Sequence, residues 1–137
     1  MLFRSPYSVE QSIIEGDLEV KALFQYVKDE AMDCDAYQIE EGIKKWLNKI
    51  GLAAMKCYFA QKGTGNTGDF LETPDGTVLK REKELRERIY FSIFGKLKLP
   101  RTCYRVKGMP GMMPLDVQAN LPKIGRASCR ERVSSPV

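Results

Sequence analysis

Basic side chains gather in one stretch of the second half of the chain, where they could bind phosphate groups. Lysine and arginine donate to phosphate oxygens, which gives nucleic-acid affinity that depends on salt and little on base sequence. In a strand, alternation would place Lys96 and Lys98 on one face, and Pro100 could bring the following arginines to the same side. The alternative is a sheet edge that lysine protects from aggregation. The DNA-binding candidates are Lys96, Lys98, Arg101, Arg105 and Lys107.

A glycine-rich loop at residues 63–68 is the second candidate, because Gly-Thr-Gly-Asn-Thr-Gly fits the G-x-G-x-x-G pattern of dinucleotide sites. In those sites a strand precedes the glycines and a helix opens inside the motif. Here a helical pattern precedes the loop, and a Thr-Pro-Asp-Gly turn follows at 73–76. The loop also lacks the Lys-Ser or Lys-Thr of a phosphate-binding P-loop. We therefore interpret it as a flexible linker.

Cysteine and histidine usage argues against a metal site. The chain has four cysteines, no two of them in a C-x-x-C pair, and no histidine. A zinc site would need scattered thiolates or carboxylates, and the commonest general base is missing. We expect the cysteines to be small buried apolar residues in a reducing compartment. They are Cys34, Cys57, Cys103 and Cys129.

Length and composition fit one small globular domain. The chain has 137 residues, of which 43% are hydrophobic and 29% charged. No apolar run approaches the roughly 18 residues that suggest a membrane helix, and the N-terminus lacks the apolar core of a signal peptide. We therefore expect a cytoplasmic protein that has no contact with a membrane.

The two ends of the chain resemble the translation of a sequencing adapter. Residues 124–133 match one adapter, and residues 1–5 match its counterpart if a GTG codon is read as the initiator. We interpret 1–5 as a scar and 124–137 as an adapter-derived or unrelated tail, and exclude both from fold reasoning. Arg4 contributes one positive charge and the tail two, so the net charge of +4 falls to +1 for residues 6–123. The high isoelectric point is therefore no argument for nucleic-acid binding.

Charge and periodicity divide residues 6–123 into an acidic helical part and a basic strand-rich part. Residues 6–35 carry eight acids against two lysines, and residues 77–107 carry ten bases against three acids. We expect Asp17 to cap a helix, with a shorter helix possible around residues 9–14. Its apolar stripe is Val20, Leu23, Phe24, Val27 and Ala31.

A second helix should begin at Asp35, where Gln38 completes a capping box. Its apolar stripe runs from Ile39 to Tyr58, so the two helices should pair as an antiparallel hairpin. Strand patterns follow at 77–80, 89–94 and 96–107, with a tight turn at Gly95. The predicted fold class is α+β, a helical hairpin followed by a small antiparallel sheet and an irregular C-terminal tail. Its segments are a helical region (6–62), a linker and turn (63–76), a basic hairpin or small sheet (77–107) and an extended Pro/Gly linker (108–123).

Several of these segments resemble the N-terminal region of the ISKra-type insertion-sequence transposases. The resemblance lies in residues 16–21 and 90–105, in Pro114-Leu115-Asp116 and in Leu121-Pro122, and it covers nearly all of 6–123. Those enzymes are similar to other DDE transposases, whose metal-binding acidic triad lies on an RNase H-like core. The resemblance places that triad downstream of Leu121-Pro122, so no acid of this chain is assigned to it. In the intact parent, two Mg²⁺ ions about 4 Å apart would drive phosphoryl displacement.

The resemblance implies the N-terminal region of a bacterial DNA transposase, truncated before its catalytic domain. We expect no catalytic residue, metal, cofactor or small-molecule substrate for this chain, and DNA at the element ends or the rest of the transposase as its partner. If it binds DNA, it would be associated with the nucleoid. The alternatives are a small dimerisation module or a non-functional product of gene prediction. Self-association would use the aromatic residues of the second helix, which are Tyr37, Trp46, Tyr58 and Phe59.

Overall fold

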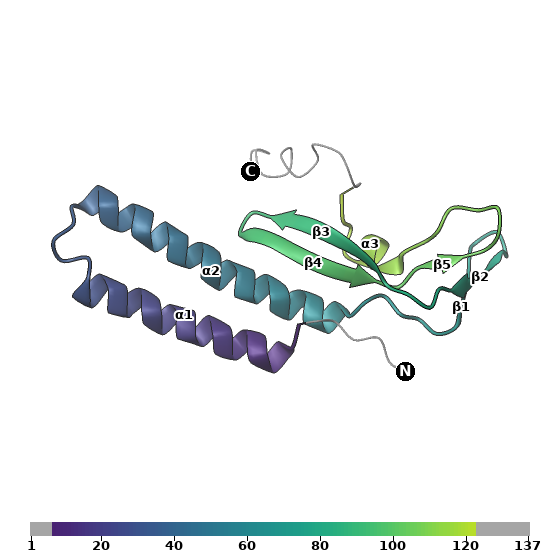
Figure 1. Cartoon of the computed structure of the whole chain (residues 1–137), viewed down its shortest axis with the longest axis horizontal. Coiled ribbons are helices and arrows are strands. Elements are labelled where there is room, and N and C mark those ends of the chain that lie inside the picture. The colour runs from purple at the N-terminus through teal and green to yellow at the C-terminus, as the bar shows by residue number, and fades with distance from the viewer. Residues whose placement is uncertain (1–6, 123–137) are drawn as a thin grey trace. The chain divides into compact units, whose positions relative to one another are not determined.

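The computed structural model describes residues 7–122, which divide into two compact units. The helical unit consists of residues 7–61 with 91–96, and the sheet unit of residues 62–90 with 97–122. The adapter-like segments at 1–5 and 124–137 lie outside the described residues. Two long helices come first and small antiparallel sheets follow, which confirms the predicted α+β class (Figure 1).

Helix α1 (Val9–Asp29) is one continuous helix, whereas the sequence predicted a cap at Asp17 and allowed a shorter helix before it. Ser8 supplies the N-cap, because its hydroxyl oxygen accepts from the Gln11 N–H at 3.2 Å. The helix then continues through Gly16, where glycine costs about 1 kcal/mol relative to alanine and does not end the helix. The predicted cap at Asp17 was therefore wrong.

Helix α2 (Ala36–Lys62) begins at the capping box that the sequence predicted. The Asp35 N–H donates to Gln38 Oε1 at 3.1 Å, and the Gln38 N–H donates to Asp35 Oδ1 at 2.8 Å. These reciprocal bonds satisfy two backbone N–H groups that the helix itself leaves without an acceptor. The two helices form the predicted hairpin, joined by residues 30–35.

The helices of the hairpin meet along a narrow seam. Tyr26 stacks on Trp46 with ring centroids 5.0 Å apart, and Lys56 pairs with Glu15 at 3.1 Å. The predicted apolar stripe of α1 is only partly buried, since Phe24 is 67% exposed. A hairpin of two helices can cover only one face of each, which leaves the rest of a wide stripe open. Buried residues of the helical unit include Ser12, Leu23, Ala31, Ala53 and Phe59.

Three short strands form the first sheet, in the order β1-β2-β5, with both neighbouring pairs antiparallel. They are β1 (Phe70–Glu72), β2 (Val78–Arg81) and β5 (Tyr104–Arg105). Strand β1 lies inside the segment predicted as linker and turn, because the Asp-Gly turn joins β1 to β2 as a hairpin. At its tip the Gly76 N–H donates to the Thr73 carbonyl at 2.9 Å.

Strands β3 (Arg86–Ser92) and β4 (Gly95–Arg101) form a second, two-stranded sheet. Ile93 and Phe94 make the turn, and Gly95 has a φ of +141°, which few residues other than glycine adopt. This tip belongs to the helical unit, where a Cβ added to Gly51 of α2 would overlap the ring of Phe94. Glycine at position 51 therefore lets the aromatic ring lie against the helix backbone.

The segment 108–123 was predicted to be extended, but residues 114–118 form a short helix, α3 (Pro114–Gln118). Proline suits the first turn of a helix because its ring presets φ and the missing N–H would have no partner there. Leu115 is 1% exposed and anchors α3 within the core of the sheet unit. Other buried apolar residues of this core are Leu79, Tyr90, Leu97, Leu99, Cys103 and Tyr104.

The glycine-rich loop is bound into the sheet unit and is not the flexible linker that the sequence predicted. The Tyr104 hydroxyl accepts from the Thr67 N–H at 2.8 Å and donates to the Gly68 carbonyl at 2.7 Å. Gly65 has a φ of +83°, and a Cβ there would lie 2.7 Å from the Leu115 backbone nitrogen. The glycine pattern therefore serves close packing, through partners that lie far along the chain.

Two helix glycines should respond oppositely to alanine. Gly51→Ala should lower the free energy of unfolding by about 1–2 kcal/mol, because the overlap with the Phe94 ring outweighs the gain in helix propensity. Gly16→Ala is the matched control: its Cβ would lie 3.8 Å from that of Ala53, an ordinary contact. It should stabilise the chain by up to about 1 kcal/mol. Urea unfolding measures both, and a Gly51→Ala protein as stable as Gly16→Ala would contradict the packing of Phe94.

Asp75, in the turn between β1 and β2, should have a carboxyl pKa below its usual value. Hydrogen bonds from the Thr73 side chain and then the Thr77 N–H lower the pKa of Asp75 from 3.8 to about 2. Because the folded pKa is the lower one, the stability from these bonds is present above about pH 3.8 and is lost as the pH falls toward 2. In Thr73→Ala the pKa should rise toward 3.8 by NMR titration. An unchanged pKa would show that this hydroxyl is not its main cause.

Candidate functional site

The lysines among the predicted DNA-binding residues lie at the surface of the described chain. Strand β4 alternates, with Lys96 and Lys98 exposed and Leu97 and Leu99 buried at 1% each. The prediction that the two lysines share a face is therefore confirmed. Lys96 Nζ lies 5.8 Å from the ring centroid of Phe91. Lys107 is exposed in the turn that follows β5.

Arg101 is buried within the sheet unit, so it does not lie on the exposed face with the lysines, where the sequence analysis had placed it. It is 4% exposed, its Nη1 donates to Asp116 Oδ2 at 2.7 Å, and its Nε donates to the Arg86 carbonyl at 3.1 Å. The alternation of β4 continues through Pro100 and places Arg101 on the same buried face as Leu99. Pro100 therefore does not bring the arginine round to the lysine face, as the sequence had suggested.

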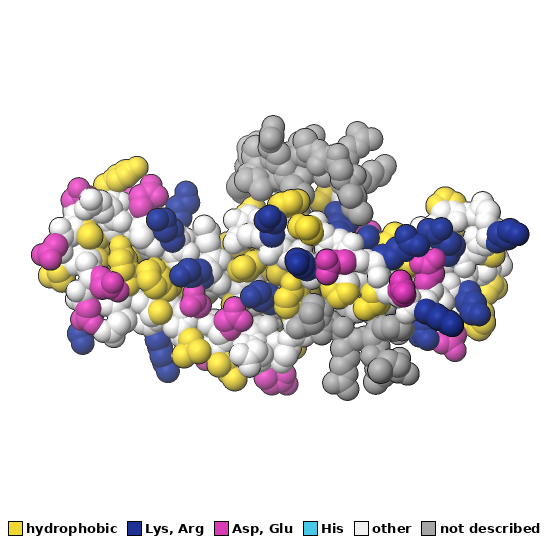
Figure 2. Space-filling model, in the orientation of Figure 1, with side chains coloured by type: hydrophobic (Ala, Val, Ile, Leu, Met, Phe, Trp, Pro, Cys, Tyr) yellow, Lys and Arg dark blue, Asp and Glu magenta, His cyan; other side chains and the backbone are white. Residues whose placement is uncertain are grey.

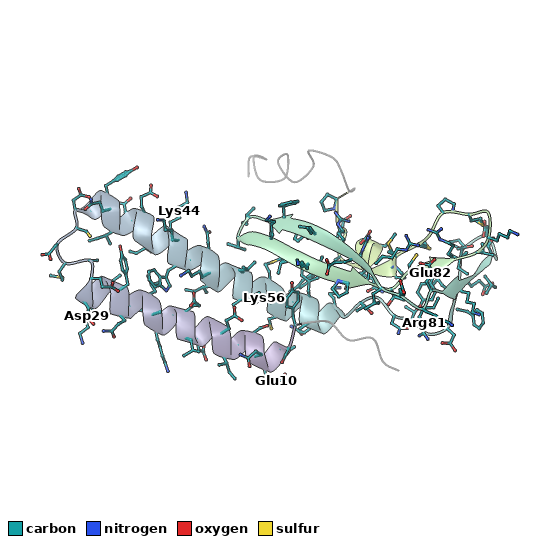
Figure 3. The ribbon with its side chains drawn as sticks, viewed as in Figure 1. Glu10, Asp29, Lys44, Lys56, Arg81 and Glu82 are labelled. Carbon is teal, nitrogen blue, oxygen red and sulfur yellow. The ribbon has the colours of Figure 1, made fainter. Side chains whose placement is uncertain are left out.

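Arg105 is exposed but shares a carboxylate with a second arginine. Its Nε lies 3.5 Å from Glu82 Oε2, while Arg86 donates to Glu82 through Nε at 2.9 Å and Nη2 at 3.4 Å. Glu82 is labelled in Figure 3. The Arg86 hydrogen bonds lower the pKa of Glu82, so this acid is ionised at neutral pH and offsets part of the local positive charge. The net charge of the basic stretch is unchanged, because Glu82 is one of its three acids, but the negative charge lies beside Arg86 and Arg105 and offsets them locally.

The structure brings together a largely buried cluster that the sequence did not single out, made of the buried Arg88 and Arg101 and the half-buried Asp116. The two arginine side chains are each 5% exposed, and both approach Asp116 Oδ2, Arg101 at 2.7 Å and Arg88 at 3.5 Å. Arg88 also donates through Nη2 to the Pro122 carbonyl. Among the described residues, Arg88 Nε and Asp116 Oδ1 are buried and have no hydrogen-bond partner.

Arg88 was overlooked because it ends a charged run, 82–88, that resembles a solvated surface. The usable signal was alternation, since Arg88 and Tyr90 share one face of β3 and both are buried. The cluster also explains part of the stretch that carries the resemblance. In Pro114-Leu115-Asp116, the proline starts α3, the leucine fills the core and the aspartate accepts from the buried arginines.

The helical unit presents a groove with apolar walls and a large exposed apolar surface. The groove has a volume of about 350 Å³ and is lined mainly by Ile13, Gly16 and Val20 of α1 and by Ile50, Ala54 and Cys57 of α2. Figure 2 shows hydrophobic side chains along the visible face of these helices. Large apolar residues exposed on this unit include Ile13, Ile14, Leu18, Val20, Phe24, Leu47 and Tyr58.

The cysteines divide into one buried and two half-buried thiols. Cys103 is fully buried, as predicted, and burial raises the pKa of its thiol. Cys34 and Cys57 are half-buried, and Cys129 lies outside the described residues. Within residues 7–122, no three histidine, cysteine or acidic side chains are grouped so that they could hold a metal ion. No helix in that range has the length and apolar character needed to span a membrane.

No family model, curated protein or solved structure matches this chain. The resemblance to ISKra-type transposases therefore remains a prediction from the residues quoted above.

The buried cluster should be sensitive to loss of its one carboxylate. Asp116→Asn would leave two buried guanidinium groups without an anion and should cost about 3–5 kcal/mol of folding free energy. The control is Glu82→Gln in the exposed network, which should cost at most about 1 kcal/mol because solvent screens that pair. Equal midpoints for the two variants in urea unfolding would show that the buried cluster contributes no more than a surface contact.

Proposed function

We propose that the chain is the region that precedes the catalytic domain of an ISKra-type insertion-sequence transposase, and that it joins two copies of that protein. The observation that carries the proposal is the apolar surface of the helical unit, with residues such as Phe24 and Leu18 exposed at 67% and 59%. Large contiguous apolar patches on a protein surface mark interaction sites. The resemblance, which spans nearly all of 6–123, supports the transposase assignment.

The groove between α1 and α2 supports an interface built by helices. Gly16 and Ala54 are small residues in its lining, while Ile13 and Val20 stand exposed beside them. Small residues leave a depression and larger ones form ridges, which is the relief that lets a second helix pack closely. The occupant we propose is the helical unit of a second copy of this chain.

Charge complementarity favours a second copy as the partner. Helix α1 carries five acids against two lysines, while α2 carries five lysines against two glutamates. Figure 3 shows members of the two sets, Glu10 and Asp29 on α1 and Lys44 and Lys56 on α2. In a two-fold dimer the same patch is used twice, so α1 of one copy can face α2 of the other in both halves. Each acidic helix would then meet a basic one.

DNA binding is the second candidate function, and the exposure of Lys96, Lys98 and Lys107 favours it. Such lysines would contact phosphates at the element ends and position the transposase without reading bases. In this proposal the chain itself performs no chemistry. Mg²⁺ and the acidic triad belong to the catalytic domain of the parent enzyme, which would act on the bacterial chromosome in the cytoplasm.

The dimer proposal predicts a self-association that tolerates salt, because apolar surface supplies the affinity and the helix charges set only which helices meet. The full chain should sediment as a dimer with a dissociation constant of roughly micromolar order, and Val20→Glu should make it a monomer. Val78→Glu is the matched control, since Val78 is exposed at 53% but lies in the sheet unit. Circular dichroism should show that both variants keep their helices.

Salt separates the two candidate functions. Association through apolar surface should hold or strengthen as salt rises, whereas DNA affinity through lysines should fall steeply between low and physiological salt. A chain that stays monomeric at about 100 µM, a hundredfold above that dissociation constant, would overturn the dimer proposal. Salt-sensitive DNA binding by that monomer would favour the second function.

A further inference from the structure

A pocket of about 480 Å³ in the sheet unit is lined by the buried guanidinium groups of Arg88 and Arg101. Asp116 is the one acid among its lining residues. Its other walls are mainly apolar and include Met113, Val117 and Leu121. All of these residues belong to the sheet unit, so the pocket does not depend on how the two units are arranged.

The two arginines of the cluster have N–H donors that form no hydrogen bond within it. Arg101 donates a hydrogen bond through Nε to the Arg86 carbonyl and another through Nη1 to Asp116 Oδ2. Arg88 donates through Nη2 to the Pro122 carbonyl, and its Nη1 lies 3.5 Å from Asp116 Oδ2. Its Nε has no hydrogen-bond partner among the described residues. A guanidinium group has five N–H donors in a planar fork, so both arginines can donate further hydrogen bonds to an anion.

The charge of the cluster does not balance. Arginine stays protonated in proteins, so two guanidinium groups face the single carboxylate of Asp116, and one positive charge is left over. The side chains that carry this charge are each 5% exposed, where water compensates it poorly. Removing a charge from water without a partner is costly, and proteins normally pair such groups with a counter-ion.

We propose that this pocket binds an oxyanion, a phosphate or carboxylate group, held by the guanidinium groups of Arg88 and Arg101. Two oxygens of a carboxylate or a phosphate group match the arginine fork with two parallel hydrogen bonds, which chloride cannot form. The ligand neutralises the surplus charge, and an apolar portion of it lies against Met113, Val117 and Leu121. Asp116 sets the spacing of the two arginines and disfavours ligands with more than one negative group near its carboxylate. This site is independent of the dimer and DNA proposals, which use other residues.

Direct observation of the arginine side chains tests the site in the unmodified full chain. Inorganic phosphate and acetate are titrated separately at constant ionic strength, with chloride as the reference salt, while the arginine Nε–H signals are followed by NMR. Saturable shifts confined to Arg88 and Arg101 are expected. Shifts with phosphate alone identify a phosphate site, and shifts with both anions identify a general oxyanion site. Signals that stay unchanged with both anions, each up to about 50 mM, would overturn the proposal, since that bound excludes even weak millimolar binding.

A variant that removes the surplus charge separates a ligand site from a purely structural cluster. At about ten times its dissociation constant, the anion should raise the melting temperature of the chain by roughly 4 °C. In Arg88→Met this rise should vanish, while the melting temperature without added anion stays equal or increases. Lys83→Met removes the same charge from an exposed position of the sheet unit that has no part in either proposed function, and it should keep the full response. An Arg88→Met protein that unfolds more easily and still gains stability from the anion would refute the assignment.

Discussion

The carboxylate of Asp116 is the contact on which the sheet unit depends. It lies on α3, accepts from Arg101 of β4 and lies within reach of Arg88 of β3, while Arg88 continues to the carbonyl of Pro122. One half-buried carboxylate thus contacts arginines from two strands and links them to α3. Charge pairs are strong in a low-dielectric interior, but a buried charge that loses its partner is strongly destabilising.

The helical unit is organised by a different constraint, the limited surface that two helices can cover. Tyr26 and Trp46 stack in the seam, and Gly51 admits the Phe94 ring, so part of α2 is occupied. The remaining apolar stripe of α1 stays open, with Phe24 among its most exposed members. Exposed apolar surface of this kind is typical of an interaction site, and this is why we propose a second copy with complementary charge as its partner.

Local chemistry explains which sequence predictions held. The capping box at Asp35 and Gln38, the Asp-Gly turn before β2 and the alternation of Lys96 and Lys98 each involve residues a few positions apart. Two of the predictions that did not hold concern packing between distant segments. The glycine-rich loop is bound by Tyr104, and Arg101 is drawn inward by Asp116, partners that no local pattern reveals.

The amino-acid sequence by itself determined the α+β class, the start of α2, the main strands and the separation into an acidic and a basic part. These features follow from backbone geometry and periodicity, which act over one or two turns of chain. Tertiary structure alone decided which charges are solvated and which are buried. The sequence does not distinguish the arginines at positions 88, 101 and 105. In the structure, Arg88 and Arg101 lie in a cluster with Asp116, whereas Arg105 faces solvent. Burial depends on which distant parts of the chain surround a residue. The chemistry that the residue can perform depends on the same surroundings.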